Sequence, residues 1–396
     1  MKSSPANIGL FTLIFFLWLC TSAGQITKYL HARAPLLFLA GAVCVALVLV
    51  VTSALQNRRA TQISTWWLVL FWVLAAAAYF AIYPITQRHI FGPGSDSENA
   101  MLTAATELLH GHFPYYKRTF LNTPITPMPG SLLLSMPFLL LGRISYQALF
   151  WLAIFVLFCV RFFRFRITAL AFLLVTILGS AGVLNELVAG DDYTFNAIYI
   201  AIAIWWIVRA HESGSAWQSW LAAVFLGIAL SSRVIYVVVP PLVFAWLAQR
   251  HGLPAAIRTI AVSALIALGL TLPFYLHDPA HFTPLQVNGK LAFLSPSLQR
   301  TAQTLFPALA MLIACTAFFQ RLTFARLFLL AGLATGAILF PATILFLFYD
   351  RFSPASQLFL EYVTPTAIYV SLWAFYRFEA LNLPASPVPE TIAQSV

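Results

Sequence analysis

The sequence predicts an all-α, polytopic integral membrane protein with about twelve membrane-spanning helices. Of its 396 residues, 61% are hydrophobic and only 9% are charged, whereas roughly a quarter of the residues in a soluble domain are charged. The apolar residues fall into runs close to the ~20 residues that cross a bilayer as a helix, and basic residues gather in the short links between them. Membrane topology therefore explains the net charge of +10, and we expect no nucleic-acid partner.

Three apolar runs precede the first long polar stretch. Residues 8–22 resemble a secretory signal, but because many spans follow, we prefer an uncleaved first helix. The runs 35–55 and 66–85 are each long enough to cross the bilayer. An Arg-Arg pair between these two runs marks the cytoplasmic side, which places the following stretch, residues 86–128, outside.

The outer loop 86–128 predicts an amphipathic helix on the membrane surface, over about residues 97–110. Asp96 lies in a run of short polar side chains that suit a helix N-cap. Glu98 falls in the first turn, where the helix dipole favours an acid. Apolar residues then recur at helical spacing, and Gly111 is a suitable C-terminal stop.

The apolar run 129–141 is too short to be a comfortable span. Residues 146–160 follow it and lead into an arginine-rich cluster at 161–166. If both runs crossed the membrane, this cluster would face outside, against the positive-inside rule. We therefore expect 129–141 to lie at the surface or dip into the membrane, and 146–160 to return the chain to the cytoplasm.

Eight further runs alternate across the membrane, with arginines in their cytoplasmic links. They cover residues 167–188, 192–209, 217–231, 234–249, 257–276, 302–319, 326–349 and 357–377. The total is about twelve spans, within a range of 11–13, in a single transmembrane domain of residues 1–378. A second outer loop is expected at 277–301, and residues 379–396 form a short disordered cytoplasmic tail.

This topology places nine of the twelve carboxylates on the outer side. They are Asp96, Glu98, Glu107, Glu186, Asp191, Asp192, Asp278, Asp350 and Glu361. Charged groups within or beside spans are costly in lipid and typically mark a polar cavity. We therefore expect a polar cavity that opens to the outside. The four cysteines lie in apolar runs without metal or redox spacing, and we interpret them as buried apolar residues.

Several motifs resemble the outer loop and later segments of the GT-C superfamily of membrane glycosyltransferases. The loop carries Asp96-Ser-Glu98, then Gly111-His-Phe-Pro-Tyr115-Tyr116, then a proline-bearing entry into the membrane at 127–129. Two weaker matches are Leu230-Ser-Ser-Arg233 with the prolines that follow it, and the segment from Leu272 to Phe282 with its Asp278-Pro pair. The resemblance touches most of residues 91–365.

The resemblance implies transfer of a sugar from a polyprenyl-phosphate donor to an acceptor outside the cytoplasm, with inversion. It implies Asp96 as the general base that takes the acceptor proton, and Glu98 is the second choice. Arg233 lies between two apolar runs without an acid nearby in sequence, so a donor phosphate is a plausible partner. Each of the three residues also has a structural interpretation, namely an N-cap, a first-turn acid and an arginine at the lipid headgroups.

Further candidates share the same outer side. Lys117, Arg118 and Lys290 could bind the donor phosphate, and Asp191, Asp192, Tyr115 and Tyr116 could bind substrate. No cofactor is required, because a monophosphate donor does not oblige a metal. A divalent cation at the paired aspartates is conceivable, but they suit the cap of the next helix equally well, and no histidine spacing indicates zinc.

The alternative function is a polytopic transporter or a flippase for lipid-linked sugars. Such a protein should show charges inside its spans, inverted repeats and broken helices at matching places. The two halves of this sequence do not resemble each other, and its charges cluster at one face rather than in mid-span. We therefore expect a glycosyltransferase of the bacterial inner membrane, with an active site that faces the periplasm or the cell exterior. Its partners are membrane lipid, the polyprenyl-phosphate sugar and an acceptor that the sequence does not name.

Overall fold

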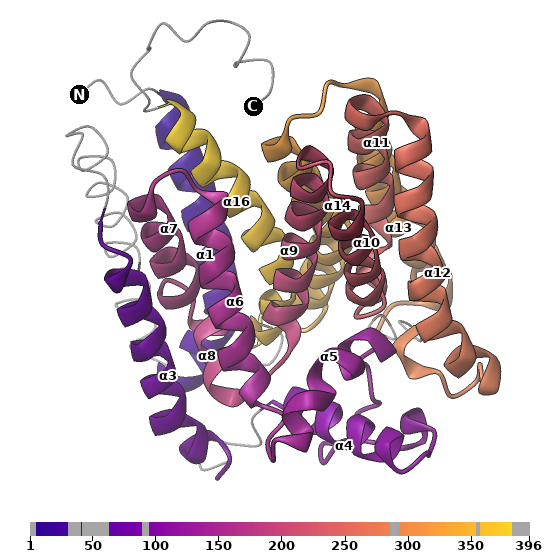
Figure 1. Cartoon of the computed structure of the whole chain (residues 1–396). Helices are drawn as coiled ribbons and strands as arrows, with labels where there is room; N and C mark the ends of the chain where they lie inside the picture. Colours follow the sequence, from indigo (N-terminus) through magenta and orange to yellow (C-terminus); the bar gives the residue numbers. More distant parts are fainter. Residues whose placement is uncertain are drawn as a thin grey trace, which may run out of the picture.

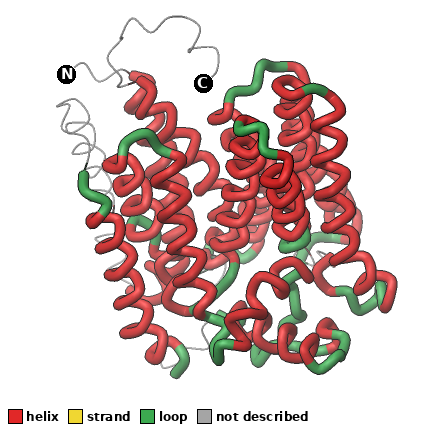
Figure 2. Tube along the Cα trace, in the orientation of Figure 1, coloured by secondary structure: helices red, strands yellow, loops and turns green. Residues whose placement is uncertain are grey.

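The computed structural model describes residues 5–30, 41, 63–88, 95–285, 291, 293–353 and 357–381. These residues form helices joined by turns and loops, as Figures 1 and 2 show, and within them the extended structure is limited to one isolated β-bridge between Arg118 and Pro124. The predicted all-α class is confirmed. The predicted span at 35–55, apart from residue 41, and the candidate Lys290 lie outside the described residues.

The helices follow the apolar runs of the sequence closely. They are α1 (Pro5–Leu30), α3 (Trp66–Thr86), α4 (Ser97–Leu109), α5 (Pro129–Leu140), α6 (Tyr146–Phe162), α7 (Arg166–Leu173), α8 (Ala181–Ala189), α9 (Tyr193–Glu212), α10 (Ala216–Leu230), α11 (Val239–His251), α12 (Leu253–His277), α13 (Pro296–Cys315), α14 (Phe324–Tyr349) and α16 (Thr364–Leu381). α13 begins six residues before the predicted span at 302, inside the predicted second outer loop. α16 continues into the first residues of the predicted tail.

Seven helical segments of the described chain are long and apolar enough to cross a membrane. They are Trp66–Thr86, Tyr193–Glu212, Val234–His251, Leu253–His277, Pro296–Phe319, Phe324–Tyr349 and Leu358–Ala380. The number rises to eight if the bent pair α7 and α8 forms one span. The protein is therefore a helical membrane protein.

The bundle has two chemically different ends. α4 and α5 lie across one end, and the links from α6 to α7, α9 to α10, α11 to α12 and α13 to α14 lie at the other (Figure 1). At this second end, the Glu379 carboxylate accepts hydrogen bonds from the backbone N–H groups of Arg164 and Phe165, at 3.0 and 2.7 Å. The arginine-bearing links thus gather at one end, whereas the acids of the predicted outer loop gather at the other.

α4 forms where the sequence predicts an amphipathic helix. It runs from Ser97 to Leu109, and Gly111 follows it with a φ of +75°. The N–H of Gly111 bonds to the carbonyl of Leu108, and that of His112 bonds to the carbonyl of Glu107. These two bonds form a Schellman motif, which only a residue that tolerates the left-handed conformation completes at low cost. The buried face of α4 packs against α5 and the following loop.

The run 167–188 is not the continuous span that the sequence predicts. α7 passes through a π-helical turn at Leu174–Leu178 and then bends by 79° into α8. Ser180 caps α8 by accepting from the N–H of Val183, and the N–H of Ala181 donates to Ser22 Oγ of α1. The break is stable because hydroxyl groups from a distant helix satisfy the backbone groups that it exposes.

α5 begins against the end of α10. The N–H of Gly130 bonds to the carbonyl of Ser231 at 2.8 Å, and a Cβ at position 130 would lie 2.1 Å from the carbonyl oxygen of Ile228. Only glycine permits such a close approach of two backbones. This contact fixes the start of α5 beside the turn that carries Arg233.

Candidate functional site

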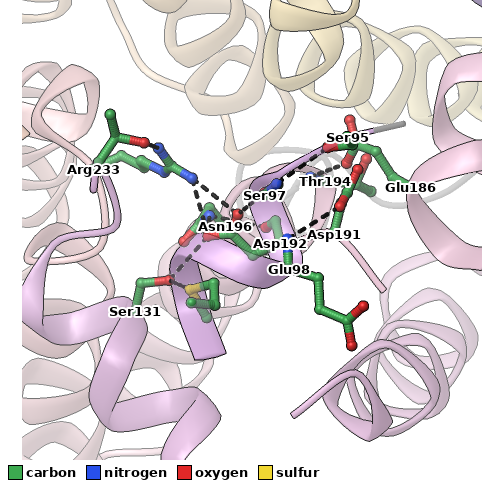
Figure 3. A network of polar contacts seen from close by, with 12 residues as sticks. Ser95, Ser97, Glu98, Ser131, Glu186, Asp191, Asp192, Thr194, Asn196 and Arg233 are labelled. Carbon is green, nitrogen blue, oxygen red and sulfur yellow. Dashed lines mark hydrogen bonds and ion pairs between the residues drawn. The ribbon is translucent and has the colours of Figure 1, made fainter. Parts of the chain in front are cut away.

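A polar cluster lies where four segments meet at the end of the bundle that α4 and α5 cover (Figure 3). These segments are the start of α4, the start of α5, the turn between α8 and α9, and the turn after α10. The sequence-predicted candidates Asp96, Glu98, Asp191, Asp192 and Arg233 all lie in or beside this cluster. The structure therefore brings together residues up to 137 positions apart in the chain.

Asp192 is the centre of the cluster. Its carboxylate is fully buried and accepts hydrogen bonds from Ser97 Oγ at 2.9 Å, Ser131 Oγ at 3.1 Å and Asn196 Nδ2 at 2.8 Å. Arg233 Nη2 lies 2.9 and 3.1 Å from its two oxygens. Asp192 thus links α4, α5, α9 and the turn after α10.

Arg233 has an acidic partner, Asp192, although no acid lies near it in the sequence. Burial alone would raise the pKa of Asp192, but Arg233 and the hydrogen-bond donors outweigh burial and lower it, so the pair is ionised. Nη1 of Arg233 also donates to Thr126 Oγ1 at 3.2 Å, and the guanidinium lies 5.6 Å from the centre of the Tyr193 ring. Its buried Nε–H has no partner within the described chain.

Asp191, and not Asp96, accepts from the first turn of α4. The N–H of Glu98 donates to Asp191 Oδ1 at 3.3 Å, and the Ser95 hydroxyl also bonds to this carboxylate. Burial, together with the neighbouring acids, raises the pKa of Asp191 to about 8. The predicted N-cap position at Asp96 is confirmed, but the Asp96 side chain does not accept from the first turn; Ser95 Oγ accepts from the N–H of Ser97 at 3.2 Å. A carboxylate from the α8–α9 turn satisfies the helix terminus instead.

Asp96 instead turns its side chain toward the loop after α4. Oδ2 accepts hydrogen bonds from the hydroxyls of Thr119, at 2.6 Å, and Thr123. The side chain is half-buried, and Oδ1 has no partner among the described residues. Two donors therefore hold one oxygen and leave the other available, a geometry that suits a carboxylate able to accept a proton.

The Glu98 side chain links α4 to α3 through hydrogen bonds. Its oxygens accept from the Tyr83 hydroxyl at 2.6 Å and from Gln87 Nε2 at 2.7 Å. Burial raises the pKa of Glu98, although these donors partly oppose the shift. In Figure 3 its carboxylate points away from Asp191 and Asp192. This arrangement favours the structural interpretation of Glu98 over the catalytic one.

The two loop tyrosines have different environments. The hydroxyl of the buried Tyr115 donates to the carbonyl of Pro127 at 3.1 Å, so Tyr115 packs the loop against α5. Tyr116 is 54% exposed, and its hydroxyl donates to Asp278 Oδ2 at 3.0 Å. Of the two, only Tyr116 can meet a ligand without rearrangement.

Lys117 and Arg118, the basic pair of the outer loop, both have their partners within that loop. Lys117 Nζ lies 3.6 Å from Glu107 Oε1, and Arg118 Nη1 donates to the carbonyl of Asn122 at 2.9 Å. Both side chains are exposed. The structure does not bring them into the cluster around Asp192.

Several residues of the site carry no recognisable signal in the sequence. Thr119 and Thr123 hold Asp96, and Ser131 holds Asp192, but isolated hydroxyl residues in a polar loop do not stand out. Asn196 is the exception, because it follows Asp192 by four residues at the start of a helix, where the two side chains are neighbours.

The donor set at the paired aspartates does not fit a metal ion. Among the described residues, no group of three or more His, Cys, Asp or Glu side chains is arranged to hold one. Asp192 is already paired with a guanidinium, and Asp191 accepts from a helix terminus. The arrangement instead places a buried, charged arginine on Asp192, and Ser97, the residue after Asp96, on the same carboxylate.

Comparison with protein-family models, with curated proteins and with solved structures gave no match for this chain.

Proposed function

We propose that this chain is a membrane glycosyltransferase of the GT-C type, which transfers a sugar from a polyprenyl-phosphate donor to an acceptor outside the cytoplasm. One observation carries the proposal. Asp96 and Arg233 lie at the same end of the bundle, because Ser97, the residue that follows Asp96, and Arg233 bind the same carboxylate of Asp192. The reaction needs two groups from the protein: a general base, which is Asp96, and a cation for the leaving phosphate, which is Arg233.

In this reaction Oδ1 of Asp96 accepts the proton of an acceptor hydroxyl as its oxygen attacks the anomeric carbon of the sugar. The bond from that carbon to the phosphate oxygen breaks, and polyprenyl phosphate leaves with the bonding electron pair. Arg233 offers its Nε–H and its positive charge to the leaving phosphate. One displacement inverts the configuration at the anomeric carbon, and no cofactor takes part.

The proposal includes a topology of twelve spans. They are the seven long apolar segments, the bent pair α7 and α8, α1, α6, α10 and the run 35–55, with α5 at the membrane surface. The arginine-bearing end faces the cytoplasm, and the end with Asp96 faces the periplasm or the exterior of a bacterial cell. Lys117, Arg118 and Lys290 then lie on the donor side, and Asp191 and Asp192 support the site as structural acids.

A transporter or flippase is the second candidate, and the bend between α7 and α8 favours it. Broken helices are typical of substrate sites in transporters, and this break is surrounded by the buried polar side chains of Thr21, Ser22 and Ser180. The side chain of Asp96 bonds to Thr119 and Thr123 and not to the residues of the break, so variants of each can test the two functions separately.

The test uses purified protein in detergent with a panel of radiolabelled polyprenyl-phosphate hexoses and pentoses. We expect wild type to release or transfer the sugar and Asp96→Asn to lose this activity while it remains folded. Glu107→Gln is the matched control, because Glu107 is an acid of the same loop whose partners among the described residues are His112 and Lys117. Binding without turnover, together with movement of the lipid between leaflets of vesicles, would favour the flippase.

A further inference from the structure

A rigid aromatic surface lies beside the loop that holds Asp96. It consists of Phe113, Tyr116, His277 and His281, which we call the aromatic platform. The ring centres of Tyr116 and Phe113 are 4.7 Å apart, those of Tyr116 and His281 are 5.3 Å apart, and those of Phe113 and His277 are 4.9 Å apart. The platform joins the segment after α4 to the end of α12 and the turn that follows it.

The exposed ring of Tyr116 is fixed in place. Its hydroxyl donates to Asp278 Oδ2, and the same oxygen lies 2.7 Å from Nδ1 of His281. The other oxygen of Asp278 accepts from the backbone N–H groups of Ala280 and His281. An aromatic ring that is both exposed and held at its polar tip is already ordered, so a ligand that stacks on it loses little side-chain entropy.

The chemistry around the platform selects a neutral, hydroxyl-rich ligand. Both nearby carboxylates are already paired, Asp278 with His281, and Glu107 with His112 and Lys117. An anionic ligand would meet Asp278, and an acyl chain would meet imidazoles, of which His281 is 61% exposed. A sugar ring presents an apolar face to an aromatic ring and hydroxyls to polar neighbours, which matches this surface.

The platform is also within reach of the proposed base. Tyr116 and Thr119 are three residues apart, so their Cα atoms are separated by at most about 11 Å of extended chain. The Thr119 hydroxyl bonds to Asp96. The segment that carries Tyr116 is therefore anchored to Asp96 through a residue only three positions away.

We propose that the aromatic platform is the acceptor subsite and that the acceptor is a neutral glycan, which binds by stacking one sugar ring on Tyr116. This inference rests on the proposed glycosyltransferase function. It names the class of acceptor that the enzyme uses.

The test measures binding, so it needs neither donor nor turnover. Purified full-length protein in detergent is applied to an array of neutral oligosaccharides built from hexoses, N-acetylhexosamines and deoxyhexoses. We expect binding to at least one of these glycans, and Tyr116→Ala should weaken it roughly tenfold. Tyr116→Phe keeps the ring and should bind nearly as well as wild type, which shows that a loss in the alanine variant is not a loss of folding.

The matched control is Tyr349→Ala. Tyr349 is a tyrosine at the same end of the bundle, 61% exposed, whose ring centre is 4.8 Å from that of Phe293. Equal losses in Tyr116→Ala and Tyr349→Ala, or no binding to any neutral glycan, would overturn the proposal. A weaker association of Tyr116→Ala with lipid vesicles, with glycan binding unchanged, would overturn it in favour of a membrane-anchoring role.

The outcomes separate this proposal from the proposed function. Glycan binding through Tyr116 without any donor turnover would leave a carbohydrate site and remove the base assignment. Donor turnover that depends on Asp96, without glycan binding, would keep the enzyme and remove the acceptor subsite.

Discussion

At the scale of single residues, the ion pair between Asp192 and Arg233 shows how the site is held. Two charges leave water at a high cost, which their attraction offsets only when further hydrogen bonds complete the geometry. Asp192 meets this condition because Ser97, Ser131 and Asn196 complete its shell. The pair therefore fixes the position of Arg233, and removal of one partner leaves the other buried and uncompensated.

We predict that Asp192→Asn destabilises the protein by about 3–5 kcal/mol, because it leaves Arg233 buried without its charge partner. Thermal unfolding in detergent measures the change. The control is Glu212→Gln, which removes an exposed pair with Arg209 and should cost at most about 1 kcal/mol. Similar losses in both variants would contradict the role of Asp192.

The raised pKa of Asp191 makes the stability of the protein depend on pH: stability should fall as pH rises. Its pKa is about 8 in the folded protein, against an ordinary value of 3.8, so the folded state retains a proton that the unfolded state has lost. The protein should therefore lose stability as pH rises from about 4 to about 8, with little further loss above this window.

The variant Asp191→Asn isolates this effect. It keeps an oxygen that can accept from the N–H of Glu98 but has no charge to bury. We predict that it is more stable than wild type by several kcal/mol at a pH above about 8, and that the difference shrinks as pH falls. Unfolding curves over that range measure it, and parallel curves for the two proteins would show that Asp191 does not titrate as described.

At the scale of the helices, the start of α5 depends on a missing side chain. The backbone N–H of Gly130 bonds directly to the end of α10, and a Cβ at this position would collide with the carbonyl oxygen of Ile228. We predict that Gly130→Ala forces the two helices apart, destabilises the protein by roughly 2 kcal/mol or more and displaces Arg233.

The control for this prediction is Gly269→Ala in α12. A Cβ there meets open space, and alanine is a better helix former than glycine by up to about 1 kcal/mol. We expect this variant to be neutral or slightly stabilised by thermal unfolding. If Gly130→Ala left the thermal stability unchanged, the contact between α5 and α10 would be shown to adjust at little cost.

Helix positions could be predicted because apolar runs are local. α3, α6 and α9 to α12 begin and end close to the limits of these runs. The bend after α7 could not be predicted, because the groups that stabilise it are the hydroxyls of α1, some 160 residues earlier. The N-cap position of α4 at Asp96 could be predicted, but the acceptor of the Glu98 N–H could not, since Asp191 lies some 90 residues further along the chain.

At the scale of the whole molecule, the separation of charges between the two ends is the main feature that the sequence predicts. It follows from the spacing of arginines between apolar runs, which any chain inserted in a membrane must respect. The pairing of Asp192 with Arg233 did not follow, because it depends on how α9 and α10 pack. The sequence thus indicates which residues share an end, but not which of them touch.

We predict that single cysteines at Ser213 and Ala280 react with an impermeant thiol reagent from opposite sides of the membrane. Ser213 lies in the link between α9 and α10, and Ala280 lies in the turn after α12. In intact cells the reagent should label position 280 only. Labelling at position 213 from outside would invert the proposed topology.

The most direct test of the central claim compares donor turnover by Asp96→Asn and Glu98→Gln in the same assay. One oxygen of Asp96 has no hydrogen-bond partner among the described residues, whereas both oxygens of Glu98 already accept hydrogen bonds, from Tyr83 and Gln87. We predict that Asp96→Asn loses about 10²–10⁴-fold in the rate of sugar transfer, while Glu98→Gln loses stability but keeps most of its rate per folded molecule. Full turnover by Asp96→Asn, or its loss only in Glu98→Gln, would contradict the account.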